Sequence, residues 1–279
     1  MSRQIMEKLA LVIIFFIIVL SADLILSYKD SNDKGTEEKM QLVGTNEDMF
    51  VWDGTKIKGL TGEGRIQTKL VIPDKCTAIS KGVLCQGVAT SVVFEGGSID
   101  LSGVFSDMET LVSVELPNDT AVIGDDAFRN CKALSRISLP ASVSEIGDSA
   151  FLGCSSLKNI NLGDCAIKKI QTNAFRNAGL EGITIPDGTE EIGKYAFYGC
   201  VGITSVYIPD SVRNLHMNAF GGTSMEKATF GQYAQFSIFD YNAFGDRSGN
   251  TTVYIKENSW MDNNRYSWNI EAFKGVLYY

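Results

Sequence analysis

Apolar residues recur along this chain at intervals of 22 to 24 residues. The most regular position is a pair of alanine and phenylalanine. It occurs as Ala127-Phe128, Ala150-Phe151, Ala174-Phe175, Ala196-Phe197, Ala219-Phe220 and Ala243-Phe244, with Val104-Phe105 in the same register upstream. A fixed period of this length is typical of a solenoid, in which each coil buries its apolar side against the next. We therefore expect one repeat domain, and we expect its function on a repeated surface rather than in one pocket.

Each unit also contains a short stretch in which apolar residues alternate with other residues, as in Ile137-Ser138-Leu139 and Ile183-Thr184-Ile185. This alternation predicts a strand with one buried face. Proline often follows and would end the strand, because it cannot donate to a ladder. We count nine such strands, from Leu70–Ile72 to Val253–Ile255. Stacked in parallel at about 4.8 Å each, they would form a ladder roughly 40 Å long.

A second apolar column follows the strand in most units. Its members are Ile79, Ile123, Ile146, Ile170, Ile192 and Leu215. Glycine comes next at Gly124, Gly147 and Gly193, which predicts a tight turn. A polar residue such as Asp125 or Asp148 then precedes the alanine and phenylalanine, an order that favours a capped single helical turn. The predicted fold is a repeat solenoid of the leucine-rich-repeat type, with a parallel β ladder on one side and short helical turns on the other.

The combined frame, L-x-x-I-x-I-P-x-x-V-x-x-I-G-x-x-A-F-x-x-C-x-x-L, resembles the BspA-like leucine-rich repeats of bacterial and protist surface proteins over about residues 50–279. The residues that match position by position are Leu134, Ile137, Leu139, Pro140, Val143, Ile146, Gly147, Ala150, Phe151, Cys154 and Leu157. The resemblance implies binding to extracellular-matrix proteins and attachment to host or neighbouring cells. It does not name a ligand, because a fold does not determine a function.

Residues 9–22 form an uncharged apolar run behind Arg3 and Lys8, and apolar character continues to about residue 28. Such a run is typical of a signal-peptide core, or of a signal anchor if it is not cleaved. A buried core helix is the third interpretation. Either of the first two exports the repeats, as a membrane-anchored surface protein or as a secreted one. We therefore divide the chain into an apolar N-terminal helix (1–28), a polar linker (29–48) and the repeat domain (49–279).

The repeats depart from their frame near both ends of the array. Residues 85–103 lack a clear proline and the alanine-phenylalanine pair. After Phe244 the next pair, Ala272-Phe273, follows 29 residues later, and the segment between carries Trp260, Tyr266 and Trp268. We expect residues 256–279 to cap the open end of the core, since terminal repeats are usually atypical. The alternative is an aromatic platform for a ligand.

The formal charge of −8 disfavours a nucleic-acid partner, because such binding relies on clustered Lys and Arg. The chain has one histidine, His216, which we expect to be an exposed turn residue without a partner. Catalytic arrangements of the Ser-His-Asp or Cys-His kind would depend on it. Acidic pairs such as Asp125-Asp126 recur at turns, so we interpret them as a solvated edge rather than as hydrolase carboxylates.

The six cysteines show no metal-ligand spacing, and we predict neither a metal site nor a cofactor. Cys131, Cys154 and Cys200 each follow a repeat phenylalanine by three residues, and we expect free thiols packed in the core. Export leaves a Cys131–Cys154 disulfide open as an alternative, since the two lie on adjacent coils. The segment Gly62-Glu63-Gly64 is too short for a phosphate loop, and we expect a hairpin there rather than the start of a helix.

The middle residue of each strand points away from the core and makes the best candidate for a binding surface. With its flanking positions, the predicted set is Glu115, Ser138, Asn161, Thr184, Tyr207, Arg136, Lys158 and Tyr254. This polar face suits an extended protein or glycan ligand at the cell surface, unless it is merely solvated. We expect an exported, membrane-tethered, non-enzymatic domain for adhesion or protein interaction. The alternatives are a scaffold for a partner in its own envelope and, disfavoured, a hydrolase.

Overall fold

The computed structural model describes residues 47–97, 99–240, 242–245, 250–264 and 273–279. They belong to a compact unit, Thr45–Tyr279, that is separate from Met1–Gly44. The predicted apolar helix 1–28, and the linker apart from Glu47 and Asp48, lie outside the described residues. No helix within the described ranges is long and apolar enough to cross a membrane.

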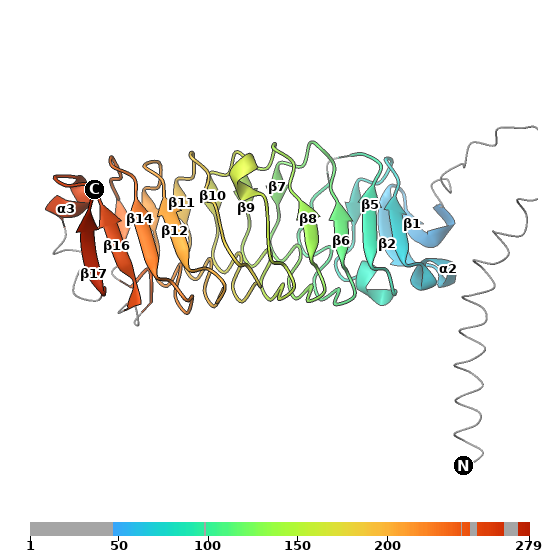
Figure 1. The fold of residues 1–279 in the computed structure, drawn as a ribbon. Coiled ribbons are helices and arrows are strands. Elements are labelled where there is room, and N and C mark those ends of the chain that lie inside the picture. Colours follow the sequence, from blue (N-terminus) through green and yellow to red (C-terminus); the bar gives the residue numbers. More distant parts are fainter. Residues whose placement is uncertain (1–46, 98, 241, 246–249, 265–272) are drawn as a thin grey trace, which may run out of the picture. The chain divides into compact units, whose positions relative to one another are not determined.

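Two sets of four parallel strands form one side of the solenoid, and we call them the long-strand ladders (Figure 1). The first consists of β3 (Lys69–Ile72), β5 (Ser91–Phe94), β6 (Ser113–Glu115) and β8 (Arg136–Ser138). The second consists of β12 (Ser205–Ile208), β14 (Lys227–Phe230), β16 (Thr252–Ile255) and β17 (Gly275–Tyr278). The strand register places an apolar residue of each strand beside an apolar residue of the next strand, as in Val92, Val114 and Ile137. Seven of the nine predicted strands are therefore present, and β17 is an additional one.

The predicted nine-strand ladder is wrong at two coils, because residues 160–162 and 183–185 are not strands. The side chain of Asn161 is the cause. Its Oδ1 accepts from the backbone N–H of Leu139 at 2.8 Å, and its Nδ2 donates to the Leu139 carbonyl at 3.0 Å. The amide thus takes the place of a ladder strand, and the chain turns into the short 3-10 helix η3 (Leu162–Asp164). The next coil then has no extended neighbour on that side and forms no ladder either.

A second side of the solenoid is a continuous parallel ladder of two-residue strands, which we call the short-strand ladder. In chain order they are β7 (Val122–Ile123), β9 (Glu145–Ile146), β10 (Lys169–Ile170), β11 (Glu191–Ile192), β13 (Asn214–Leu215) and β15 (Ile238–Phe239). Its inward residues from Ile123 to Leu215 are fully buried, which confirms the second apolar column. Ile79 in β4 (Ala78–Ile79) instead pairs with Ile57 of the N-terminal hairpin.

The glycines after the short strands serve close packing between coils rather than a special turn conformation. None of Gly124, Gly147 and Gly193 has a positive φ. A Cβ on Gly147 would lie 2.6 Å from Oδ1 of Asp125, and one on Gly193 would lie 2.7 Å from the backbone carbon of Gln171. These distances are too short for any side chain. The sequence predicted glycine here because of a tight turn. The structure shows instead that glycine is required by close packing between coils.

The alanine-phenylalanine pairs form the third side of the solenoid, and they lie in turns rather than in helices. The backbone N–H of Phe151 donates to the carbonyl of Ala174 in the next coil at 2.7 Å, and the other repeat phenylalanines up to Phe220 do likewise. A helix would need that N–H for a bond within its own coil. The residue before each alanine from Ala127 to Ala219 is left-handed, for example Asp126 at φ 54 and Asn173 at φ 57. The predicted helical turns are therefore hydrogen-bonded loops between coils.

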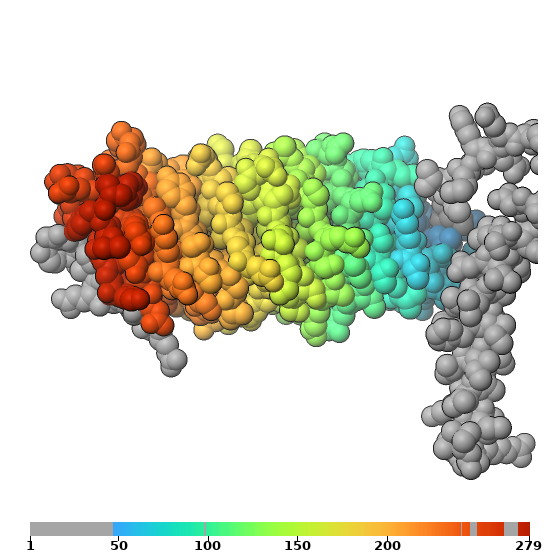
Figure 2. All heavy atoms as spheres, in the orientation of Figure 1, coloured from blue at the N-terminus to red at the C-terminus, as the bar shows by residue number. Residues whose placement is uncertain are grey.

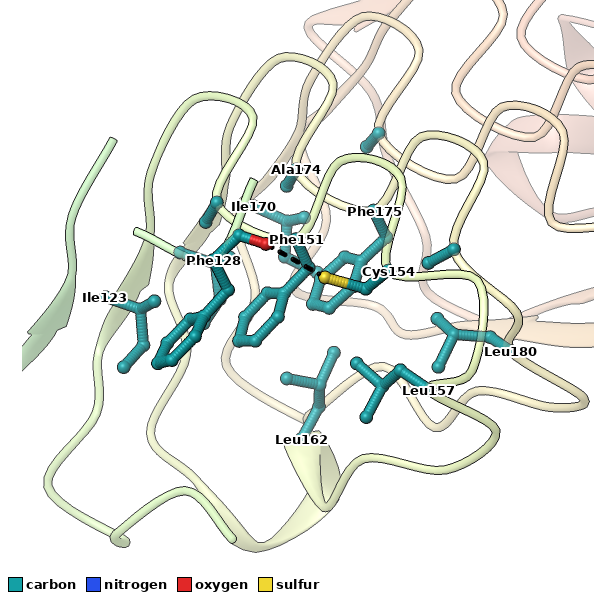
Figure 3. Close-up of a cluster of buried hydrophobic side chains, with 14 of the residues drawn as sticks. Ile123, Phe128, Phe151, Cys154, Leu157, Leu162, Ile170, Ala174, Phe175 and Leu180 are labelled. Atoms are coloured by element: carbon teal, nitrogen blue, oxygen red, sulfur yellow. Dashed lines mark hydrogen bonds between the residues drawn. The ribbon is translucent and has the colours of Figure 1, made fainter. Parts of the chain in front are cut away.

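Seven phenylalanine rings stack along the centre of the solenoid, and Figure 3 shows three of them, Phe128, Phe151 and Phe175. Successive centroids from Phe105 to Phe244 are 4.9 to 5.5 Å apart, with interplanar angles of 1 to 14°. At each end the next ring is turned on edge, Phe94 at 86° and Phe273 at 72°. The six rings from Phe105 to Phe220 are fully buried. The ring spacing matches the spacing of the strands, so side-chain packing and backbone pairing keep the same period.

The N-terminal end is an antiparallel hairpin of β1 (Phe50–Asp53) and β2 (Lys56–Leu60), followed by the helix α2 (Gly62–Ile66). The hairpin therefore lies before Gly62, and the glycines predicted to form it begin a helix capped by Thr61. The 3-10 segments η1 (Glu47–Met49) and η2 (Leu84–Gln86) complete this end. At the C-terminal end, the helix α3 (Trp260–Asn263) sets the Trp260 ring 5.9 Å from Phe236. Tyr266 and Trp268 lie outside the described residues.

Candidate binding surface

The middle residues of the long strands form a row on the outer side of the ladders, which we call the outward row. Strand register places Glu115 beside Ser138 in the first ladder, and Tyr207, Thr229, Tyr254 and Leu277 side by side in the second. Glu115, Ser138, Thr184 and Tyr207 are exposed, whereas Thr229 and Tyr254 are half-buried. Figure 2 shows this side of the solenoid, where the coils follow one another in sequence order.

Asn161 does not belong to the exposed row, although the sequence predicted it there. Both ends of its amide bond the backbone of Leu139 in the previous coil, and the residue is half-buried. A hydrogen-bonded amide of this kind is not available to a ligand without breaking two bonds. Asn161 therefore has a structural role. Nothing in the sequence distinguishes it from Ser138 or Thr184, which hold the corresponding positions.

Two predicted cationic residues flank the outward row. Arg136 begins β8, pairs in register with Ser113 and is exposed. Lys158 lies 3.4 Å from a carboxylate oxygen of Glu181 in the next coil, and both side chains are more than half exposed. Exposed ion pairs of this type contribute little to stability, so Lys158 can exchange partners with a ligand at low cost. The middle of the row is thus polar and charged.

The end of the row nearest the C-terminus is aromatic and apolar. Tyr207, Leu277 and Tyr279 are 48%, 49% and 49% exposed, and Tyr254 lies under the ammonium group of Lys227 at 4.5 Å. The hydroxyl of Tyr279 donates to the carbonyl of Phe230 at 2.5 Å, which fixes its ring. We call Tyr207, Tyr254, Leu277 and Tyr279 the aromatic end.

Tyr207 and Tyr279 remain protonated at neutral pH. Burial raises the pKa of Tyr207, and the nearby carboxylates of Asp210 and Asp187 raise it further. Burial likewise raises the pKa of Tyr279. The Tyr207 hydroxyl can therefore donate a hydrogen bond to a ligand, and its ring can bury apolar area.

Leu277 was missed in the sequence because β17 lacks the proline and the alternation frame of the other strands. The signal that would have found it is the period itself. Val276 follows Val253 by 23 residues and pairs with it in register, so Leu277 stands beside Tyr254.

His216 is not an exposed turn residue without a partner, and that prediction is corrected. Its side chain is 17% exposed, with Nε2 3.5 Å from a Glu191 oxygen and Nδ1 3.8 Å from an Asp240 oxygen. Leu215 pairs with Ile192, so the imidazole lies one coil from Gly193, where no side chain competes for space. In the described part of the chain, these two carboxylates are the only charged groups within ion-pair distance of His216. A catalytic arrangement of the Ser-His or Cys-His kind would also need a hydroxyl or thiol nucleophile, which a carboxylate does not supply.

The cysteines are free, and five of the six are buried. The thiol of Cys154 donates to the carbonyl of Phe128 at 3.1 Å, as the dashed line in Figure 3 shows. Cys131 and Cys200 make the same bond one coil back, at 3.0 Å each. The cysteine column therefore links coils by hydrogen bonds rather than by disulfides. Over the residues that the structure describes, no group of three or more His, Cys, Asp or Glu is placed to hold a metal ion.

Comparisons with known proteins agree with this architecture. A family model described as a BspA type leucine rich repeat region matches in six copies, over residues 98–180 and 168–267. The solved leucine-rich repeat protein from T. pallidum is 27% identical over 66% of this chain and 83% of that chain, with a TM-score of 0.45. The pneumococcal vaccine antigen PcpA is 16% identical over 76% of this chain and 56% of that chain, with a TM-score of 0.54.

A leucine rich cell surface protein from Faecalibacterium prausnitzii is 18% identical over 82% of this chain and 92% of that chain, with a TM-score of 0.44. A search of the curated proteins finds no match. The family model spans more than half of the chain. The similarity to the pneumococcal antigen is one of fold. These matches indicate a repeat scaffold and point to no catalytic family.

Proposed function

Because this chain belongs to the family of proteins with BspA-type leucine-rich repeats, we propose that it is an exported, non-enzymatic binding protein that mediates adhesion or protein interaction at the cell surface. Residues 9–28 would tether it to the membrane, since their apolar run follows Arg3 and Lys8. The relatives described as a vaccine antigen and as a cell surface protein support this placement.

The observation that carries the proposal is the aromatic end of the outward row. A rigid ladder presents Tyr207, Leu277 and Tyr279, each about half exposed, beside the cations Lys227 and Lys256. Exposed aromatic clusters on a fixed backbone are typical of interaction surfaces, because aromatic side chains bury large area at low entropic cost. The polar row upstream would fix the orientation of an extended partner, so the ligand we favour is a protein.

The test is a pull-down with residues 45–279 against purified matrix proteins and against a detergent extract of the cell envelope of the producing organism. Capture of a matrix protein would support adhesion, whereas specific capture of an envelope protein alone would favour the scaffold. The double variant Tyr207→Ala/Leu277→Ala should weaken the contact at least tenfold, on the usual scale of interface hot spots of about 2 kcal/mol or more. The matched control, Glu115→Ala/Ser138→Ala, alters the same row at its other end and should retain most of the binding. Equal binding by both variants would place the contact elsewhere.

Export is tested separately by surface proteolysis of whole cells. Replacing Ile14 and Phe16 with aspartate should leave the protein inside the cell, because charges at the centre of an apolar segment oppose insertion. Mapping the mature N-terminus then separates the two forms of export. A start before residue 9 indicates an anchor, and a start between residues 22 and 29 indicates a cleaved signal.

A further inference from the structure

A cavity of about 1220 Å³ opens where the chain enters strands β14 and β16. It arises from the position that directly follows each repeat phenylalanine. Four successive coils carry the side chains of Arg129, Leu152, Arg176 and Tyr198 at this position, and the next two carry Gly221 and Gly245. Tyr198 leans over this gap, since a Cβ on Gly221 would lie 3.0 Å from its Cδ2. Two missing side chains thus leave room for a ligand.

One wall of the cavity is a pair of tyrosine rings held in place by an arginine. Tyr195 and Tyr198 meet edge to face with centroids 5.6 Å apart. The guanidinium of Arg176 lies 5.4 and 5.3 Å from the two ring centroids. Cation–π contacts of this kind restrict both rings and leave their other surfaces facing the cavity. Tyr254 also lines the cavity, with the ammonium group of Lys227 4.5 Å from its ring centroid. Flat aromatic surfaces set in a polar cavity suit the apolar faces of sugar rings.

The polar lining is cationic, although the chain as a whole carries a formal charge of −8. Lys227 and Lys274 face the cavity against a single carboxylate, Glu226. Neither lysine forms an ion pair with any residue that the structure describes. Hydroxyl and amide groups, such as those of Ser224 and Asn218, complete the lining. Two ammonium groups against one carboxylate favour a ligand that carries negative charge.

The two lysines are carried by coils two apart, which suits a linear ligand that crosses several coils. Lys227 pairs in register with Thr252, and Thr252 pairs with Gly275, the neighbour of Lys274. The backbones that carry the two lysines are therefore about two rungs apart, roughly 10 Å at about 4.8 Å per rung. An extended glycan that crosses these coils can therefore meet both lysine side chains. A phosphate cluster would instead need convergent backbone N–H groups, as in a glycine-rich phosphate loop.

We propose that this cavity binds an acidic glycan chain. The sugar rings pack on Tyr195 and Tyr198, and the carboxylates pair with Lys227 and Lys274. The site shares Tyr254 and Lys227 with the proposed protein contact but not Tyr207, Leu277 or Tyr279, so the inference does not depend on that contact.

The test is calorimetric titration of the full chain in a non-ionic detergent without a sugar head group. The probe is a hexasaccharide of alternating glucuronate and N-acetylglucosamine, and the neutral control is the hexamer of N-acetylglucosamine. The acidic probe should bind more tightly, and its affinity should fall as sodium chloride is added. Lys274→Gln should weaken it about tenfold, the usual loss for a charge-assisted contact. The matched control Lys256→Gln removes the same charge from the same end of the domain, where Lys256 lies 5.8 Å from the Tyr279 ring outside the cavity lining, and should have no effect.

A second variant tests the cavity without changing charge. Ser224→Trp places a large side chain from an exposed position into the cavity and should abolish binding, with folding checked by circular dichroism. The proposal is overturned if the acidic probe does not bind, if the neutral hexamer binds equally well, or if Lys274→Gln binds like the parent. Tighter binding of adenosine triphosphate or of polyglutamate would overturn it in favour of a nucleotide or an acidic peptide. Tyr207→Ala/Leu277→Ala should leave glycan binding intact, which separates failure of this site from failure of the outward row.

Discussion

Replacing one ring in the middle of the phenylalanine stack measures how strongly the coils are coupled. Phe151 is fully buried and stacks on Phe128 and on Phe175, with both centroid distances 5.1 Å. Truncation of a buried phenylalanine to alanine costs about 3–5 kcal/mol through lost burial and the cavity left behind. Two ring pairs are lost as well, each worth roughly 0.5–1.5 kcal/mol beyond the area they bury. We therefore expect Phe151→Ala to fall in the upper half of that range, at about 4–5 kcal/mol.

The assay is equilibrium unfolding of residues 45–279 in urea, followed by far-ultraviolet circular dichroism and by tryptophan fluorescence. Trp52 lies at the N-terminal end and Trp260 at the other, so fluorescence reports whether the two ends unfold together. A cavity in the centre of a repeat array weakens the coupling between its halves, and we expect a shallower transition than in the parent. Phe151→Leu keeps most of the apolar volume and is the matched control, with an expected cost of about 1–2 kcal/mol.

A cost below about 1 kcal/mol for Phe151→Ala, beneath the usual range for such truncations, would refute the reasoning. It would mean that the ring is not held between two neighbours, and the register of the whole column would be in question. A large loss for Phe151→Leu that equals the loss for alanine would instead show that ring stacking outweighs volume.

Three further outcomes follow from single side chains. Asn161→Ala should cost about 1–3 kcal/mol in urea, because it leaves two backbone groups of the preceding coil unbonded, whereas Thr184→Ala should cost under about 0.5 kcal/mol; equal midpoints would refute the structural role of the amide. Burial and neighbouring carboxylates raise the pKa of Asp148, so its ionisation opposes folding as pH rises through the unfolded value of about 3.9. Asp148→Asn should therefore raise the melting temperature at pH 7 and lose this advantage well below pH 3.9, and a gain that persists in acid would contradict the assignment. Burial raises the pKa of the Cys154 thiol to about 12, so native protein treated with maleimide at neutral pH should be modified at exposed Cys85 alone by mass spectrometry, and rapid modification of a second cysteine would show that the column opens.

The repeat columns were predictable from the sequence, because the types of residue reveal both the repeat period and the positions that are buried. Phe151 and Ile146 recur with their neighbours at a fixed spacing, and no arrangement other than stacking buries all of them. The family resemblance rests on the same columns. The outward row followed directly from the alternation along each strand, since side chains on a strand point to opposite faces in turn.

The predictions from the sequence that were wrong all concern atoms that meet between neighbouring coils. Asn161 occupies a position that the sequence predicts to point outward from a strand. The structure shows that its amide is instead hydrogen-bonded to the backbone of the preceding coil. Gly147 suggested a turn, although the reason for glycine is an atom of the adjacent coil. The alanine-phenylalanine segment suggested a helical turn, because the sequence does not reveal that its N–H groups pair with the next coil. In each case a contact about 23 residues away along the chain overrides a local preference.

The two rings that close the phenylalanine stack set rules for how such an array can change its length. Phe94 and Phe273 stand at 86° and 72° to their neighbours, so neither offers a flat face to an added coil. A unit duplicated at either terminus would therefore meet a ring edge and find no place to stack. A unit duplicated between Phe128 and Phe220 would meet a parallel ring on both sides. Growth and shrinkage of this domain during evolution, and any engineered lengthening, should accordingly proceed by insertion or deletion of whole interior units.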